Sequence, residues 1–142
     1  MLSKKAKYAL KALVYLATRD EQTPQQISDI ANDAAIPKKF LETILLDLKK
    51  AGMLASKRGK GGGYYLIKHP KNINMAQVMG VMDGPIALLP CVSSRYYEKC
   101  KECQDESNCG IRHYLLDVRN KTHQILTRAT LKKIIDKEYA IY

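Results

Sequence analysis

The spacing of apolar positions along the chain predicts a mainly helical fold that contains one small β-hairpin. Apolar residues recur at helical intervals in six stretches, which are residues 3–18, 25–31, 37–50, 75–83, 109–127 and 130–142. Residues 53–56 and 64–67 are instead typical of two short strands, and a basic glycine-rich turn separates them. Two helices joined by a short turn and followed by such a hairpin indicate a winged helix-turn-helix.

This pattern divides the chain into three parts. We expect a winged helix-turn-helix DNA-binding domain over residues 1–83. Residues 84–108 lack a clear periodicity, and an unstructured loop of that length in a small protein is usually functional. Residues 109–142 are expected to form a long dimerisation helix and a C-terminal helix.

Cap and turn residues predict where these helices begin and end. Thr23 is placed to cap the second helix, and Pro37 suits the first position of the third. Gly52 follows the third helix, where a left-handed residue commonly ends a helix. Asn108 is expected to cap the long helix.

The long helix carries a seam typical of a coiled coil. Its members alternate spacings of four and three, with one polar position among them: Ile111, Leu115, Val118, Thr122 and Ile125. Such a helix can fold back on its own domain or pair with a second copy. Helix-turn-helix proteins usually bind two half-sites, so we expect a homodimer on a palindromic operator.

The charge of the chain favours nucleic acid as the partner. The formal net charge is +10, and residues 1–71 hold 14 Lys and Arg against 6 Asp and Glu. A cationic surface on the helix-turn-helix half is what binding to DNA phosphates requires. No apolar run reaches 18 residues, so no membrane span is expected. Lys7 and Lys11 interrupt the first apolar stretch, which predicts an amphipathic helix of a cytoplasmic protein rather than a signal peptide.

Candidate DNA contacts lie on the third helix and on the turn of the hairpin. The start of the third helix is the end that contacts base edges in this motif, and Lys4 of the first helix is expected to contact phosphate. Glu42 is either an acceptor for cytosine N4, a partner of a nearby cation, or an ordinary solvated carboxylate. The glycine-rich turn lacks the Lys-Ser/Thr ending of a P-loop, so we interpret it as a small basic wing. The expected contacts are Lys38, Lys39, Glu42, Thr43, Lys57, Arg58, Lys60, Gly61 and Gly62.

Four cysteines fall within nineteen residues, with the spacing Cys91-x8-Cys100-x2-Cys103-x5-Cys109. Clustered cysteines in a protein without a secretion signal bind metal or sense redox state more often than they form disulfides. Thiolates suit iron–sulfur clusters and zinc alike, and redox-active free thiols are a third possibility. His113 is one helical turn from Cys109, so it is a further candidate ligand.

These segments together resemble the Rrf-type family of bacterial winged-helix regulators, which includes IscR, NsrR and CymR. The likeness covers nearly the whole chain. It is carried by Ser3-Lys4, Tyr8-Ala9-Leu10, Phe40-Leu41-Glu42, the stretch from Leu48 to Leu54 and, most specifically, Arg58-Gly59-Lys60-Gly61-Gly62-Gly63-Tyr64.

The resemblance implies a homodimeric DNA-binding transcription factor in which Glu42 and Arg58 touch DNA. It also implies a [2Fe–2S] or similar cluster in the cysteine loop, although CymR-like members carry none and respond through a protein partner. Cys103-x5-Cys109 fits the spacing of cluster-bearing members, but the preceding gap is longer and one cysteine is extra. Arg112 stands where IscR-like members have a histidine ligand, and Lys7 stands near the place of the NsrR-like aspartate ligand.

The sequence thus predicts a DNA-binding regulator whose cysteines sense iron, redox state or nitric oxide. The alternative is a cofactor-free or zinc-bound regulator controlled by thiol chemistry or by a protein partner. An enzyme is not expected, because no nucleophile and base occur at a telling spacing.

Overall fold

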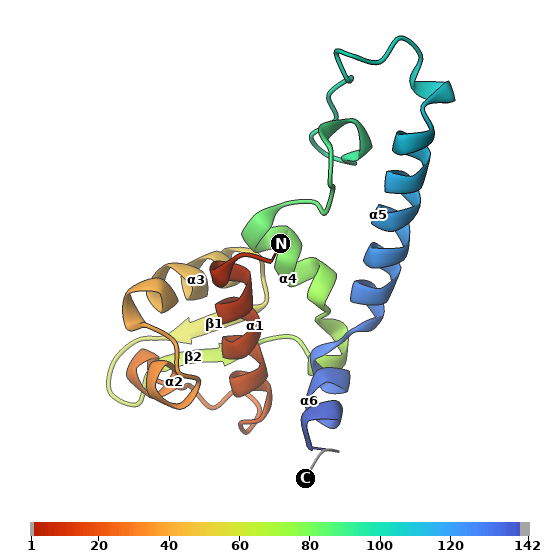
Figure 1. Ribbon diagram of the computed structural model, residues 1–142. Coiled ribbons are helices and arrows are strands. Elements are labelled where there is room, and N and C mark those ends of the chain that lie inside the picture. Colours follow the sequence, from red (N-terminus) through yellow and green to blue (C-terminus); the bar gives the residue numbers. More distant parts are fainter. Residues whose placement is uncertain (1, 140–142) are drawn as a thin grey trace.

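The computed structural model describes residues 2–139, and it consists of helices with a single two-stranded hairpin (Figure 1). The helices and strands, in chain order, are α1 (Lys4–Ala17), α2 (Ile27–Asp33), α3 (Lys38–Lys50), β1 (Leu54–Lys57), β2 (Gly63–Leu66), α4 (Met75–Asp83), α5 (Gly110–Arg128) and α6 (Leu131–Tyr139). Short 3₁₀ turns occupy Pro70–Asn72, Pro90–Val92 and Glu106–Asn108. This arrangement confirms the predicted fold class, with a winged helix-turn-helix and a long helix of 19 residues.

The core lies between α1, α3 and the elements around them. Leu13 of α1 and Leu41, Leu45 and Leu48 of α3 are fully buried, as the helical spacing predicted. Each such side chain contributes about 1.5–3 kcal/mol through burial. Leu131 of α6 is buried in the same core, so α6 packs with the N-terminal unit formed by α1 to α4 and the hairpin, although the sequence grouped it with the long helix.

The end of α3 shows how local sequence determines the turn into the hairpin. Gly52 has φ +74°, and its N–H donates to the Lys49 carbonyl at 3.0 Å. The Met53 N–H donates to the Leu48 carbonyl at 3.1 Å. These two bonds form a Schellman motif, which confirms the prediction for Gly52.

The start of α2 differs from the sequence prediction. The helix begins at Ile27 rather than Gln25, and Gln26, not Thr23, is its N-cap residue. The cause is a long-range pairing: Gln25 and Tyr64 exchange two backbone hydrogen bonds of 2.8 Å. Because this pairing keeps Gln25 extended, the helix can start only after it.

Two further helix starts are shifted by one residue. Pro37 is the N-cap of α3 and not its first residue, because its ψ of 124° is not helical. Cys109, not Asn108, caps α5, and its Sγ accepts from the Arg112 N–H at 3.5 Å. The Asn108 side chain donates instead to Asp105 Oδ2 at 2.6 Å.

Helix α5 stands beside the N-terminal unit rather than inside it (Figure 1). None of its residues, 110–128, is buried. The loop that carries the cysteines arches over its N-terminal end, away from the hairpin (Figure 1). Within the part of the chain that the structure describes, no helix has both the length and the apolar composition to cross a bilayer.

Candidate functional site

The start of α3 presents a polar and cationic surface. Lys38, Lys39, Glu42 and Thr43 are all exposed, on the side of the helix away from the buried leucines. Lys4, the first residue of α1, is exposed as well. An ion pair between Lys5 Nζ and Asp47 Oδ2, at 2.7 Å, links α1 to α3 at the surface, in addition to the core that the two helices share.

The wing, residues 57–63, exposes its three cations Lys57, Arg58 and Lys60. Its glycines are required for different structural reasons. Gly61 has φ +74° with open space around it, whereas a Cβ on Gly62 would lie 2.3 Å from the Lys57 carbonyl oxygen. Gly62 is buried, and its N–H donates to the Gly59 carbonyl at 3.0 Å. We therefore expect Gly62 to shape the wing rather than to contact DNA, contrary to the sequence-based expectation.

Gly63 holds the base of the wing against the start of α2. A Cβ there would lie 2.2 Å from the Gln25 carbonyl oxygen, and φ is +144°. Only glycine allows this approach without a shift of the backbone. The wing and the helix-turn-helix are therefore joined through the Gln25–Tyr64 pairing.

The cysteine segment, residues 91–109, holds four free thiols in two settings. Cys91 is buried in the turn Pro90–Val92, and the other three are half-exposed. Desolvation and the neighbouring Cys109 thiol raise the pKa of Cys103. A hydrogen bond to Glu102, at 3.2 Å, raises the pKa of Cys100. At neutral pH both groups are thus mainly thiols, which are weaker nucleophiles than thiolates.

The donor set of the segment suits a thiolate-bound metal, but the side chains are not in a ligating arrangement. Across residues 2–139, no three His, Cys, Asp or Glu side chains stand close enough to hold a metal ion. Among the four thiols, Cys103 and Cys109 are in hydrogen-bond contact. Four thiolates nevertheless suit an iron–sulfur cluster or zinc by their chemistry.

His113 has a different environment. Its Nε2 is 2.9 Å from the Ser107 carbonyl oxygen. Because a carbonyl can only accept, this nitrogen carries the proton and donates to Ser107. The predicted role of His113 as a metal ligand would therefore fall to Nδ1.

Two arginines of α5 connect the cysteine segment to that helix, and sequence reasoning missed both contacts. Arg112 Nε donates to the Cys91 carbonyl at 3.2 Å, and Arg119 Nη1 donates to the Val92 carbonyl at 2.6 Å. Arg112 occupies the position at which IscR-like members have a histidine ligand. This departure from the family pattern was the only sign in the sequence that Arg112 has a role of its own. Through these bonds the backbone around Cys91 is held on α5.

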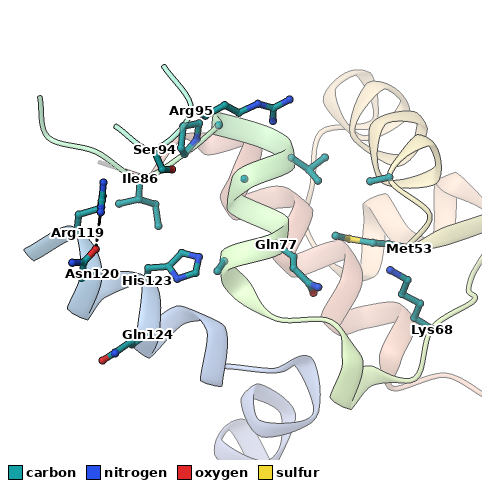
Figure 2. Close-up of a pocket in the computed structure, with 16 residues that line it drawn as sticks. Met53, Lys68, Gln77, Ile86, Ser94, Arg95, Arg119, Asn120, His123 and Gln124 are labelled. Carbon is teal, nitrogen blue, oxygen red and sulfur yellow. Dashed lines mark hydrogen bonds between the residues drawn. The ribbon is translucent and has the colours of Figure 1, made fainter. Parts of the chain in front are cut away.

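A cavity of about 940 Å³ lies along α4, and it is lined both by α5 and by Met53 and Lys68 on the other side of α4 (Figure 2). Gln77 and Gly80 of α4 line one side, and Arg119 and His123 of α5 line another. Arg119 is held there by Asn120, whose Oδ1 accepts from Nη2 at 2.9 Å (Figure 2). The N-terminal unit and α5 therefore meet along α4 without closing the space between them.

Comparison with protein families gives a match over nearly the whole chain. The model of the Rrf2 family, described as an iron-dependent transcriptional regulator, matches residues 2–137. It concerns regulators of transcription and not enzymes.

Individual relatives agree with that match. The rrf2-like HTH-type transcriptional regulator of Rhodobacter capsulatus is 47% identical over 121 residues, which cover 83% of this chain and 81% of the relative. NsrR of Bacillus licheniformis is 31% identical over 128 residues, which cover 90% of this chain and 87% of the relative. The solved structure of CymR, the global cysteine regulator of B. subtilis, superposes with a TM-score of 0.78 at 24% identity and covers 96% of this chain and 97% of CymR. That last likeness shows the fold.

Proposed function

Since this chain belongs to the Rrf2 family of DNA-binding transcriptional regulators, we propose that it binds a palindromic operator as a homodimer and that its cysteine segment controls the affinity. The observation that carries this proposal is the cap of α5. Cys109 is both one of the four clustered thiols and the residue whose Sγ accepts from the first turn of α5. A change at this thiol therefore acts directly on the helix expected to join two copies.

On the DNA side, α3 enters the major groove and the wing lies along the backbone or the minor groove. Lys4, Lys57, Arg58 and Lys60 contact phosphates, while the exposed start of α3 faces the bases. The predicted groups there are Lys38, Lys39, Glu42 and Thr43, with Gly61 allowing the wing to come close. Their exposure supports this docking.

The dimer forms through the seam of α5. Ile111, Val118 and Ile125 are 70%, 47% and 68% exposed, and Leu115 and Thr122 are half-buried. A row of exposed apolar side chains on an otherwise polar helix is stabilised when a second copy of the helix removes it from water. Two linked DNA-binding units then match two operator half-sites.

Cys91, Cys100, Cys103 and Cys109 would hold a [2Fe–2S] cluster, which supplies a one-electron redox centre that iron supply, oxidants and nitric oxide can alter. Arg112 and Arg119 hold the backbone at Cys91 and Val92 on α5. Cys109 holds the start of the same helix. A rearrangement of the four thiols thus shifts α5, and with it the spacing of the two recognition helices.

A second candidate is a thiol switch without metal, which is supported by the contact between Cys103 and Cys109. A peroxide would oxidise this pair to a disulfide, with loss of two protons and two electrons to the oxidant, which leaves as water.

Zinc bound by the same thiols would instead make the segment structural, and a protein partner that binds α5 would control the dimer without any metal. In each case we expect the protein to act where the DNA is, in the cytoplasm.

Purification without oxygen tests these candidates. Iron, acid-labile sulfide and zinc are measured per chain, together with the visible spectrum. Equal iron and sulfide with visible absorbance support the cluster, zinc alone supports a structural metal, and neither supports the thiol switch or a partner.

Operator binding is tested with Lys39→Ala and Arg58→Ala, and Lys137→Ala on α6 serves as the charge-matched control. The first two should weaken binding and lower the salt slope by about one each, because each removes a phosphate or base contact. An unchanged affinity and slope would contradict the docking.

A further inference from the structure

Phe40 is an exposed apolar side chain at the start of the recognition helix. It is the single phenylalanine of the chain, and 56% of its surface is exposed. The next residue, Leu41, is fully buried. Successive residues of a helix are turned by about 100°, so Phe40 points to the flank of α3 rather than into the core.

The Phe40 ring is nevertheless held in place. The Tyr8 ring lies beside it, with 6.2 Å between the ring centroids and an angle of 40° between the planes. Tyr8 belongs to α1 and itself packs against the core. The contact fixes one side of the Phe40 ring and leaves the other side open, as a preorganised binding group requires.

The surroundings of Phe40 indicate what covers the open side. Lys38 and Lys39 precede it and are exposed, and Lys4 at the start of α1 is exposed as well. A cationic setting favours a polyanion over the apolar face of a second copy, whose expected seam lies on α5. The occupant that fits both the charges and the position on α3 is DNA.

Within a major groove, an apolar side chain has one apolar group to contact. The base edges display hydrogen-bond donors and acceptors, and only thymine adds a methyl group, at C5. We propose that Phe40 contacts the C5-methyl of a thymine in each operator half-site and so helps to determine operator sequence. This inference rests on the proposed function, because it requires α3 to enter the major groove.

The test replaces single thymines by deoxyuridine, which removes only the methyl group. An operator duplex is first selected from a random pool with the wild-type protein. Each dT is then exchanged for dU, and the dissociation constant is measured for the wild type, Phe40→Ala and Phe40→Leu.

At one position per half-site we expect dU to weaken wild-type binding about fourfold, the effect of losing one buried methyl group, and about sixteenfold when both half-sites are changed. Phe40→Ala should bind the dT and dU duplexes equally, and Phe40→Leu should keep part of the difference. The salt slope of Phe40→Ala should equal that of the wild type, because no charge is removed.

Leu46→Ala is the matched control, since Leu46 is 48% exposed and lies further along α3. This variant should keep the full difference between dT and dU. Thermal unfolding checks the fold of each variant, and the scan with wild-type protein and Phe40→Leu decides the question if Phe40→Ala is unstable.

Two results would overturn the inference: a selected operator with no thymine sensitive to dU, or a sensitivity that Phe40→Ala retains in full. Both differ from failure of the proposed function itself, in which the wild-type protein would select no sequence from the pool.

Discussion

The unit formed by the first 83 residues and the stretch from 84 to 128 are packed in opposite ways. In the first, side chains of α1, α3 and the hairpin share a core of fully buried leucines and isoleucines. In the second, every residue of which is described, Cys91, Val92 and Ser93 are the buried residues. The first unit is therefore complete within one chain, whereas the second leaves apolar surface for the partner that we propose.

The largest expected effect concerns the core of the first unit. Leu45→Ala should lower the free energy of unfolding by about 2–5 kcal/mol, because the side chain is fully buried and leaves a cavity. Leu46→Ala, at the next and half-exposed position, should cost less than about 1 kcal/mol. Urea unfolding measures both, and equal losses would contradict the packing described for α3.

The joint between wing and α2 should be nearly as sensitive. Gly63→Ala places a Cβ 2.2 Å from the Gln25 carbonyl oxygen, so we expect a loss of about 2–4 kcal/mol from overlap and backbone strain together. Gly61→Ala meets no atom within 4 Å and should cost about 1 kcal/mol. Faster exchange of the Tyr64 amide hydrogen in Gly63→Ala alone would locate the damage at the pairing with Gln25.

The next prediction concerns the open surface of the second region. Val118→Asp should weaken the proposed dimer by about 100-fold or more, since each copy would bury an unpaired carboxylate in the seam. Gln124→Asp adds the same charge on another face of α5 and should leave the dimer intact. Sedimentation velocity over a range of concentrations compares the two, and a stable Val118→Asp dimer would exclude this seam as the interface.

The smallest effect concerns the link between the cysteine segment and α5. Arg112→Met removes the hydrogen bond to the Cys91 carbonyl, which is worth about 1 kcal/mol, so Cys91 should become accessible roughly fivefold more often. Iodoacetamide labelling of the metal-free protein, followed by mass spectrometry, measures this rate. Arg128→Met, at the other end of α5, should not alter it, and an unchanged rate in Arg112→Met would show that the bond does not hold the turn.

The difference between the two regions also explains what the sequence could predict. The stripes of α1 and α3, the Schellman turn at Gly52 and the hairpin follow from neighbours in the chain, and all were predicted. The late start of α2 depends on Tyr64, which lies 39 residues after Gln25 in the chain. It could therefore not be predicted from the residues next to α2. The starts of α3 at Pro37 and of α5 at Cys109 were each predicted one residue away from where they lie, which is the usual uncertainty of helix ends.

The functional groups follow the same rule. Exposure of Lys38, Lys39 and Glu42 followed from the helical spacing, and the clustering of the cysteines was plain from their positions. The hydrogen bonds of Arg112 and Arg119 to the cysteine segment could not be predicted. Their acceptors are backbone carbonyls, and because every residue has one, the sequence does not indicate which carbonyl is used. Phe40 lies outside the buried stripe of α3 by the same helical spacing, but its contact with Tyr8 of α1 could be seen only in the structure.

The packing of α6 against the core determines what happens when a protease cleaves the loop between α4 and α5. Leu131 is fully buried, its N–H donates to the Ile73 carbonyl at 2.9 Å, and the Met75 N–H donates to the Ala129 carbonyl at 2.9 Å. The loop and α5 therefore begin and end at the N-terminal unit, at α4 on one side and at α6 on the other. A protease that cuts the chain at the exposed pair Tyr96 and Tyr97 would therefore leave two fragments in a single particle, joined by the buried Leu131 and by these backbone hydrogen bonds.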